Sequence, residues 1–377
     1  METLISGLMA LTLKQVAMWF IGGLLIYLAI KKEFEPALLL PMGFGAILVN
    51  FPGSGVLNQV VNGTVIEGIL DFLFKGGIQT EMFPLLIFIG IGAMIDFGPL
   101  LQNPFMLLFG AAAQLGIFFT MSLAALFGKT LPEAASIGII GAADGPTAIF
   151  VTTQLANHLI GPITIAAYSY MALVPIIQPF AIKLVTTKKE RSIRMTYRAD
   201  AVSKTTKILF PIIITIIAGL IAPISLPLVG FLMFGNLLRE CGVLDRLSNT
   251  AQNELVNIVT ILLGITIATK MTAEEFLQWT TLRIVFLGLI AFIIDTVGGV
   301  LFAKLINLFN KATGRPLINP MIGAAGISAF PMSARVIQKM AQKEDPQNFL
   351  LMYAVGANVA GQIASVIAGG LILALLA

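Results

Sequence analysis

The sequence has few of the residues on which metalloenzymes and disulfide-stabilised proteins depend. Its 377 residues include one cysteine, one histidine and two tryptophans, and only 11% of the residues are charged. The lone cysteine, Cys241, excludes an internal disulfide and a thiolate metal cluster, and we interpret it as a small residue near a helix end. The histidine, His158, has no second histidine or acidic partner nearby in the sequence, and we expect it at a surface or interface.

Two other chemistries lack their motifs. Gly128-Lys129-Thr130 resembles the end of a phosphate-binding loop, but residue 123 is leucine where that motif needs its first glycine. We therefore do not expect the chain to hydrolyse ATP by that route. Residues 268–271 (Ala-Thr-Lys-Met) resemble part of a biotin-attachment sequence but lack the methionine before the lysine. We expect no biotin to be attached covalently to this chain.

Apolar residues dominate the composition. They make up 57% of the chain, and segments 97–128, 208–238 and 346–377 carry no charge. Each of these segments is long enough to cross a bilayer, so the sequence predicts an all-α polytopic protein with several passes through the cell membrane. The start Met1-Glu2 lacks the basic residues of a signal peptide, and we expect no cleaved leader.

A basic segment divides the chain. Residues 188–207 hold seven lysines and arginines against two acids. The positive-inside rule predicts a cytoplasmic loop. A nucleic-acid surface is the alternative, but it would need aromatic stacking residues and a folded scaffold, so we expect no nucleic-acid partner.

Hydropathy predicts a series of apolar elements on each side of this loop. The first series is expected at 11–30, 38–49, 83–95, 104–127 and 160–185, with a mixed, interfacial or external segment at 60–77 and a helix broken at Gly145-Pro146. The second series is expected at 208–222, 226–238, 255–269, 282–309, 316–330 and 349–376. Several of these elements are too short to span a bilayer, which favours re-entrant hairpins and discontinuous helices.

The two series resemble each other in sequence. LPMGFGAILVN at Leu40 matches LPLVGFLMFGN at Leu226, FIGIGAMI at Phe88 matches LLGITIAT at Leu262, and IGAADG at Ile140 matches IGAAGI at Ile322. The matches are collinear, and the paired elements start on opposite sides of the membrane. We therefore predict an inverted-topology repeat, with a first repeat at 1–187, the cytoplasmic loop at 188–207 and a second repeat at 208–377.

One carboxylate lies where the first repeat breaks. Asp144 follows glycines and precedes Gly145-Pro146, in a stretch that otherwise reads as buried in the membrane. Proline leaves a carbonyl without its helical partner, and a carboxylate beside such oxygens is suited to Na⁺ or a proton. Thr147 adds a hydroxyl. The alternative is a carboxylate at a loop tip that reaches water.

The matching stretch of the second repeat has polar groups but no acid. NPMIGAAGISAFPMSAR, from Asn319 to Arg335, contributes an amide, the Ser328 hydroxyl, Gly323 and a second proline break. One acid with neutral oxygens fits a monovalent cation better than Ca²⁺. Arg335 either receives an anionic substrate group or extends its charge to the interface.

Other polar residues allow two interpretations. Tyr170 is either a proton donor in the site or an interface tyrosine. Asn358 and Ser365 lie on a small-residue helix that packing alone would explain. Asp295 is a second acid within an apolar helix, and Asp96 is as easily a helix-end residue.

Long motifs give the chain a specific resemblance. KKEFEPALLLPMGFGAILVN, GIGAMIDFGPLL, GIIGAADGPTAI, AAYSYMALVPIIQP, GNLLRECGV and NPMIGAAGISAFPMSARV run through nearly the whole sequence. They resemble the β subunits of the sodium-pumping, biotin-dependent decarboxylases, which serve oxaloacetate, methylmalonyl-CoA or glutaconyl-CoA. Asp295 lies outside these motifs.

The resemblance implies a function and a set of partners. The β subunit of this family decarboxylates carboxybiotin and couples this step to Na⁺ export, with consumption of an external proton. The partners are an α subunit (carboxyltransferase), a biotin carrier subunit or domain, and a small γ or δ membrane subunit. The family's functional residues fall on Asp144, Tyr170, Asn319, Gly323, Ser328 and Arg335, with Asn358 a further oxygen ligand. A Na⁺- or H⁺-coupled secondary transporter without a chemical step is the alternative that residue chemistry alone favours.

The substrate is chosen by the α subunit and cannot be read from this chain. Oxaloacetate-type members of the family are expected to be longer after the first short hairpin. This chain is compact there, which favours an acyl-CoA substrate.

Overall fold

The computed structural model describes residues 7, 9–33, 36–61, 63–196 and 202–376. Six helices in this part of the chain are long and apolar enough to cross a membrane, or up to eight if two bent helix pairs each count as one span. The predicted all-α polytopic architecture is confirmed. Met1-Glu2, residues 34–35 of the first motif and residues 197–201 of the basic segment lie outside the described residues.

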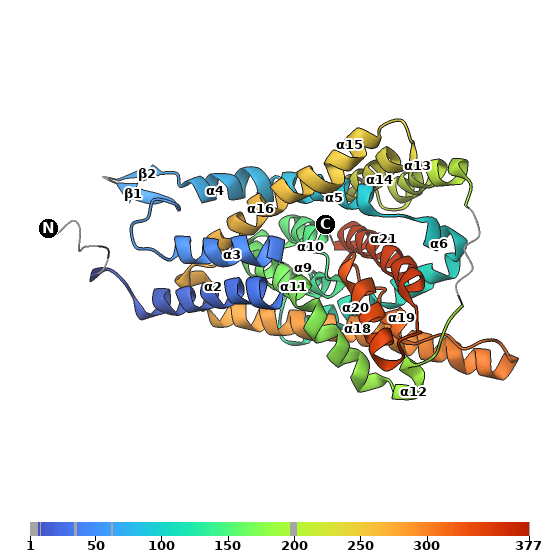
Figure 1. Cartoon of the computed structure of the whole chain (residues 1–377). Helices are drawn as coiled ribbons and strands as arrows, with labels where there is room; N and C mark the ends of the chain where they lie inside the picture. Colours follow the sequence, from blue (N-terminus) through green and yellow to red (C-terminus); the bar gives the residue numbers. More distant parts are fainter. Residues whose placement is uncertain (1–6, 8, 34–35, 62, 197–201, 377) are drawn as a thin grey trace.

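The first half of the chain contains one small hairpin and a series of helices (Figure 1). Its strands are β1 (Gln59–Val61) and β2 (Thr64–Ile66), which pair antiparallel. Its main helices are α2 (Leu13–Lys32), α3 (Pro36–Val49), α4 (Ile69–Leu73), α5 (Met82–Met94), α6 (Gly98–Gln102), α7 (Leu107–Ala112), α8 (Leu115–Leu126), α9 (Leu131–Gly138), α10 (Gly145–Leu155) and α11 (Ile160–Val185).

The second half is also helical. After the short α12 (Lys188–Arg191) come α13 (Lys204–Ile221), α14 (Leu226–Glu240), α15 (Asp245–Thr250), α16 (Val256–Ile267), α17 (Ala273–Phe276), α18 (Trp279–Thr313), α19 (Met321–Ala324), α20 (Met332–Glu344) and α21 (Leu351–Leu376). Short π and 3₁₀ segments join several of them, including η1 (Phe74–Gln79), η3 (Ile139–Ala142) and η6 (Ala251–Leu255).

Three sequence predictions need correction. The segment 60–77 holds the hairpin and the start of a helix, 69–79, which continues into α5 after a bend of 58°. The apolar element at 255–269 is the end of one long helix, Asp245–Lys270, whose polar first turns hid it from a hydropathy reading. The third correction is α20, which lies where the sequence analysis expected no element.

Two shorter helices of the first half pack against two shorter helices of the second half. Helix α3 lies against α16, and α5 lies against α14. Small residues allow these backbones to approach closely, as in many membrane helix pairs. A methyl group at Gly92 of α5 would overlap the carbonyl of Leu232, and one at Gly235 of α14 would overlap the carbonyl of Ile89.

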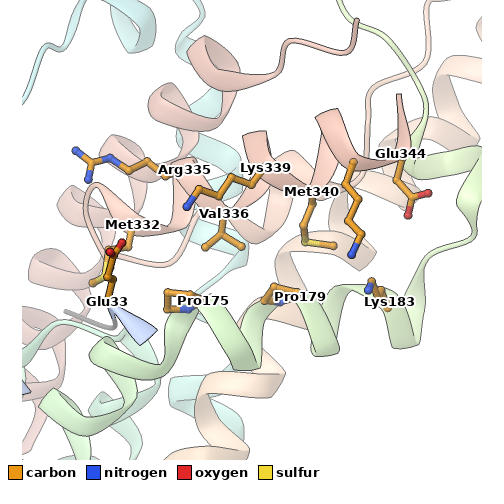
Figure 2. Close-up of a pocket in the computed structure, with 11 residues that line it drawn as sticks. Glu33, Pro175, Pro179, Lys183, Met332, Arg335, Val336, Lys339, Met340 and Glu344 are labelled. Atoms are coloured by element: carbon orange, nitrogen blue, oxygen red, sulfur yellow. The ribbon is translucent and has the colours of Figure 1, made fainter. Parts of the chain in front are cut away.

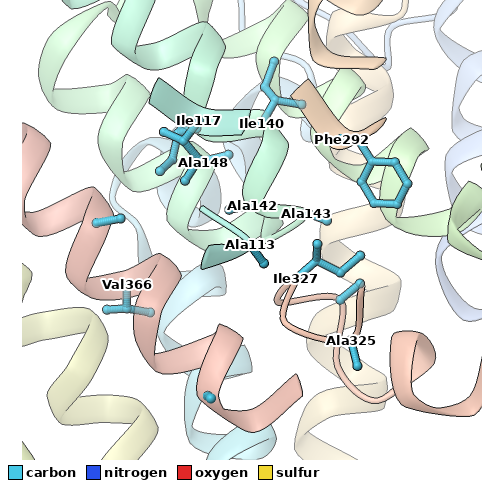
Figure 3. Packing of buried hydrophobic residues seen from close by; sticks show 14 of the residues in the cluster. Ala113, Ile117, Ile140, Ala142, Ala143, Ala148, Phe292, Ala325, Ile327 and Val366 are labelled. Atoms are coloured by element: carbon cyan, nitrogen blue, oxygen red, sulfur yellow. The ribbon is translucent and has the colours of Figure 1, made fainter. Parts of the chain in front are cut away.

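The largest apolar core surrounds the broken segment between α9 and α10 (Figure 3). Helices α8, α18 and α21 enclose it, and Ile117, Ile140, Phe292 and Ile327 are fully buried there. Polar groups in this core are therefore far from bulk water, and each needs a partner within the protein.

A valine at Gly235 should destabilise the α5–α14 contact. Because the new side chain would overlap backbone that cannot rotate away, we expect a loss of about 3 kcal/mol in unfolding free energy. The thermal unfolding midpoint of the detergent-purified protein measures this loss. Gly230→Val on the same helix is the matched control, since nothing lies within 4 Å of its Cβ position. An equal midpoint for both variants would contradict the packing described.

Candidate functional site

Asp144 lies at the point where the first broken helix changes direction. The 3₁₀ segment η3 ends at Ala142, Ala143 adopts a left-handed conformation with φ 53°, and Asp144 is the N-terminal cap residue of α10. Gly145 and Pro146 form the first turn of α10, where proline loses no hydrogen bond. The break thus places the Asp144 side chain in the protein interior, where it is buried.

Three side chains donate hydrogen bonds to one oxygen of this carboxylate. Asp144 Oδ2 accepts from Thr147 Oγ1 at 2.6 Å, from Gln362 Nε2 at 3.1 Å and from Ser365 Oγ at 3.1 Å. Thr147 belongs to α10, whereas the other two belong to α21, the last helix of the chain. Both halves of the sequence therefore contribute to the surroundings of this carboxylate.

The second break, between α19 and α20, meets the first one. Ser328 donates both its amide and its hydroxyl to the carbonyl oxygen of Ala142, each at 3.0 Å. Asn358 of α21 donates to the carbonyl of Ile327 at 2.6 Å, and its own side-chain oxygen is buried without a partner among the described residues. Figure 3 shows Ala142, Ala143 and Ile327 close together at this junction. The junction brings Asp144, Ser328 and Asn358 into one region.

The remaining predicted residues have other partners. Asn319 donates to the carbonyls of Arg191 and Ile193 at 2.8 and 2.9 Å and so holds the start of the basic segment. Gly323 packs against Gly299 of α18, where a methyl group would overlap the Gly299 carbonyl. The Tyr170 hydroxyl donates to the carbonyl of Val285, also in α18. None of these three is hydrogen-bonded to Asp144, so their roles as ligand or donor stay predictions.

Two residues near Asp144 were not singled out from the sequence. Gln362 was read as part of a small-residue helix, although an amide inside an apolar helix was a usable signal. Tyr168 is fully buried with its ring against Gly145, and its hydroxyl has no partner among the described residues. The tyrosine that lies beside the break is thus Tyr168, two positions before the predicted Tyr170.

Arg335 lines a separate cavity of about 350 Å³ between α11 and α20 (Figure 2). Arg335, Lys339 and Lys343 follow each other at four-residue intervals on α20, and Lys183 joins them from α11. The apolar part of the lining comes from Pro175, Pro179, Met332, Val336 and Met340. Two acids also line the cavity: Glu33, and Glu344, which is paired with Arg191 at 2.7 Å.

Ion pairs hold the start of the basic segment against the end of α20. Arg191 pairs with Glu344, and Arg194 pairs with Asp345. The hydrogen bond and charge of Arg194 lower the pKa of Asp345. The start of the basic segment is therefore fixed next to the cationic cavity.

Residues that the sequence left open also have partners. His158 lies 3.1 Å from Glu133 Oε1, an acid that lies 25 positions earlier in the chain. Asp96 bonds the amide of Gly98 and pairs with Lys207 at 3.1 Å, which fits a helix-end residue. Cys241 is half-buried at the end of α14.

The donor set around Asp144 suits a monovalent cation. Among the described residues no group of three or more histidine, cysteine or acidic side chains is placed to hold a metal ion. One carboxylate with two hydroxyl groups beside it matches Na⁺ or a proton better than a divalent ion.

Comparison with known proteins shows which family has this sequence. Residues 14–376 match the family model described as Na⁺-transporting oxaloacetate decarboxylase beta subunit. The chain is 50% identical to the methylmalonyl-CoA decarboxylase subunit beta of Propionigenium modestum, with 98% of this chain and 97% of the relative aligned. It is 50% identical to the glutaconyl-CoA decarboxylase subunit beta of Acidaminococcus fermentans, with 98% and 95% aligned. It is 46% identical to the oxaloacetate decarboxylase beta chain of Klebsiella pneumoniae, with 97% and 96% aligned.

These matches cover almost the full length of the chain and of each relative. Together with the apolar helices, they establish a multi-pass membrane component of a multi-subunit enzyme. The chain belongs to the family of the β subunits of the Na⁺-transporting decarboxylases.

Proposed function

We propose that this subunit decarboxylates carboxybiotin, presented by a partner carrier, and uses the reaction to export Na⁺ while an external proton is consumed. The observation that carries the proposal is the Asp144 carboxylate. It is buried at a helix break and held by side chains from both halves of the chain. Buried acids in membrane segments are costly to keep and are usually functional.

Asp144 would bind Na⁺ as the transported substrate. Thr147 and Ser365 already face its Oδ2 atom and can turn their hydroxyl oxygens towards a cation. Ser328 and the unpartnered oxygen of Asn358 lie at the adjoining break, and Asn319 and Gly323 complete the proposed set. One carboxylate holds either Na⁺ or a proton, so a proton that arrives from outside lowers its affinity for Na⁺.

The cationic cavity would receive the carboxylate of carboxybiotin. Arg335 can bind a carboxylate in a two-point geometry, and the three lysines around it add positive charge. Pro175, Pro179 and the methionines give the apolar surface that the rings of biotin require. The biotin itself remains attached to the carrier, and the carboxyl group leaves as CO₂ when a proton replaces it.

Tyr170 would take part in the proton's route. Its hydroxyl joins α11 to α18 through the Val285 carbonyl. Both helices begin on the side opposite the basic segment, and the proton would enter from that side. A phenol can pass a proton on by exchanging one hydrogen bond for another.

The two halves, 1–187 and 208–377, would form an inverted repeat around the loop at 188–207. The pairing of α3 with α16 and of α5 with α14 supports this arrangement, because a two-fold operation that maps α3 onto α14 and α5 onto α16 exchanges the two pairs. Such symmetry allows the same site to face either side of the membrane.

The α, carrier and γ or δ subunits named by the family resemblance would complete the enzyme.

The alignments favour an acyl-CoA substrate. Those with the methylmalonyl-CoA and glutaconyl-CoA relatives extend over 388 and 370 residues. Those with two oxaloacetate relatives extend over 421 and 433 residues while covering 97% and 99% of this chain, so these relatives carry additional residues.

Asp144→Asn should abolish turnover and Na⁺ transport together. An amide cannot alternate between a proton and a cation, and we expect the decarboxylation rate to fall roughly 100-fold, as for other lost electrostatic contacts. The measurement is substrate decarboxylation and ²²Na⁺ uptake by proteoliposomes that contain the whole complex.

Asp245→Asn is the matched control, since Asp245 is exposed at the start of α15. It should leave both rates unchanged. Normal turnover in Asp144→Asn would refute the proposed role of the carboxylate.

Neutralising the cavity lysines should weaken docking of the carboxylated carrier without slowing the decarboxylation of carboxybiotin once it is bound. We expect Lys339→Gln and Lys343→Gln each to raise KM for the carboxylated carrier roughly fivefold, which corresponds to about 1 kcal/mol of exposed electrostatic attraction. The effect should shrink at high ionic strength. Lys188→Gln, an exposed lysine outside the cavity, is the control. An unchanged KM in the double variant would count against this docking site.

A further inference from the structure

A second acid is buried in the core, and the mechanism above does not use it. Asp295 lies near the middle of α18 and is completely buried. Its Oδ1 atom accepts a hydrogen bond from the amide of Gly116. This amide belongs to the first turn of α8, where helical donors lack intrahelical partners. One oxygen of Asp295 therefore caps a neighbouring helix.

The other oxygen has a different environment. Asp295 Oδ2 is buried and has no hydrogen-bond partner among the described residues. It faces Gly141 in η3, so closely that a methyl group there would overlap it. Ala291, one turn earlier on α18, lies on the same side. A capping role accounts for Oδ1 but leaves Oδ2 unexplained.

Gly141 connects this oxygen to the Na⁺ site. It lies in the same broken element as Asp144, three positions before it, and the Ala142 carbonyl between them accepts both bonds from Ser328. A displacement of η3 therefore changes the surroundings of both acids at once. The two carboxylates lie on opposite sides of one short, irregular segment.

We infer that Asp295 is a proton-binding site coupled to Asp144 through η3. The ligand is a proton rather than a metal ion, because Oδ2 faces a glycine and an alanine, and a cation would require several oxygens. A charged carboxylate is costly in such surroundings, and a proton on Oδ2 removes that cost. When η3 moves away, the carboxyl can release its proton, and a proton entering from outside restores it. The inference rests on the proposed function, in which an external proton is consumed.

Few other ionisable groups face this carboxyl. From α11, Tyr170 reaches α18 at Val285, and Asp144 lies beyond Gly141 in the broken element. Helix α8 has no charged residue. On α18 itself the nearest charged residues are Arg283 and Lys304, more than two turns away in either direction. A change in pH response on mutation of Asp295 can thus be assigned to this group or to its coupling with Asp144.

Asp295→Asn tests the site, because asparagine keeps an oxygen that can cap α8 but cannot carry the proton. We expect decarboxylation by the whole complex in proteoliposomes to fall roughly 100-fold, with loss of proton consumption. The thermal midpoint and ²²Na⁺ binding by the purified complex should stay near wild type. Asp295→Ala should lose the same activity and also the cap, with a lower midpoint. Asp245→Asn is again the control.

Wild-type turnover and pH dependence in Asp295→Asn, with only Asp295→Ala impaired, would show a purely structural cap and overturn the inference. Turnover by Asp144→Asn would instead refute the proposed function, so the two failures are distinguishable.

A variant that keeps Asp295 covers the case in which Asp295→Asn does not fold. Ala291→Ser places a hydroxyl one turn from Asp295, where it can donate to the charged form of Oδ2. The pH midpoint of turnover should then move about one unit lower, since a hydrogen bond to a charged group has about that effect. An unmoved midpoint in a folded, active Ala291→Ser complex would contradict proton binding at Asp295.

Discussion

A carboxylate held inside a membrane protein needs hydrogen-bond donors that do not come from water, and the structure around Asp144 follows from that need. Helices satisfy their own backbone and leave nothing for a side chain, so donors must come from helix breaks or from polar residues of neighbouring helices. Here both sources are used. The break before α10 places the acid, and Thr147, Gln362 and Ser365 supply the donors. The close helix contacts of the core keep these groups in position.

Much of this arrangement was predictable from the sequence, and the limits have physical causes. Asp144 stands out because a single acid in an apolar run beside Gly-Pro has few explanations, and the helix over 160–185 was found with its observed bounds. Spacing along one chain does not reveal which residues of distant helices meet, so Gln362 was missed. Tyr168, whose ring lies against Gly145, was missed for the same reason.

The amphipathic helices were the hardest elements to predict. Helix α20 has a cationic row and few long apolar side chains, and the helix over 245–270 begins with polar turns. Helix α20 falls below what a hydropathy reading takes as a membrane segment, and the polar first turns of the other helix conceal where it begins. The cavity lysines became a recognisable group only when α20 placed Lys339 and Lys343 in register with Arg335. The cationic cavity was therefore not predicted, because it depends on the helix that sequence reasoning did not find.

Two contacts of the second break are made by backbone alone. Gly323 lies against Gly299 of α18, and Gly326 lies against Gly361 of α21, with no side chain between the members of either pair. Interlocked side chains must change rotamers before two elements can slide past each other, whereas bare peptide surfaces need not. At the two glycine pairs, the segment from Gly323 to Ser328 can therefore shift between α18 and α21 without any rearrangement of side chains. A larger residue at any of these four positions would hinder this movement.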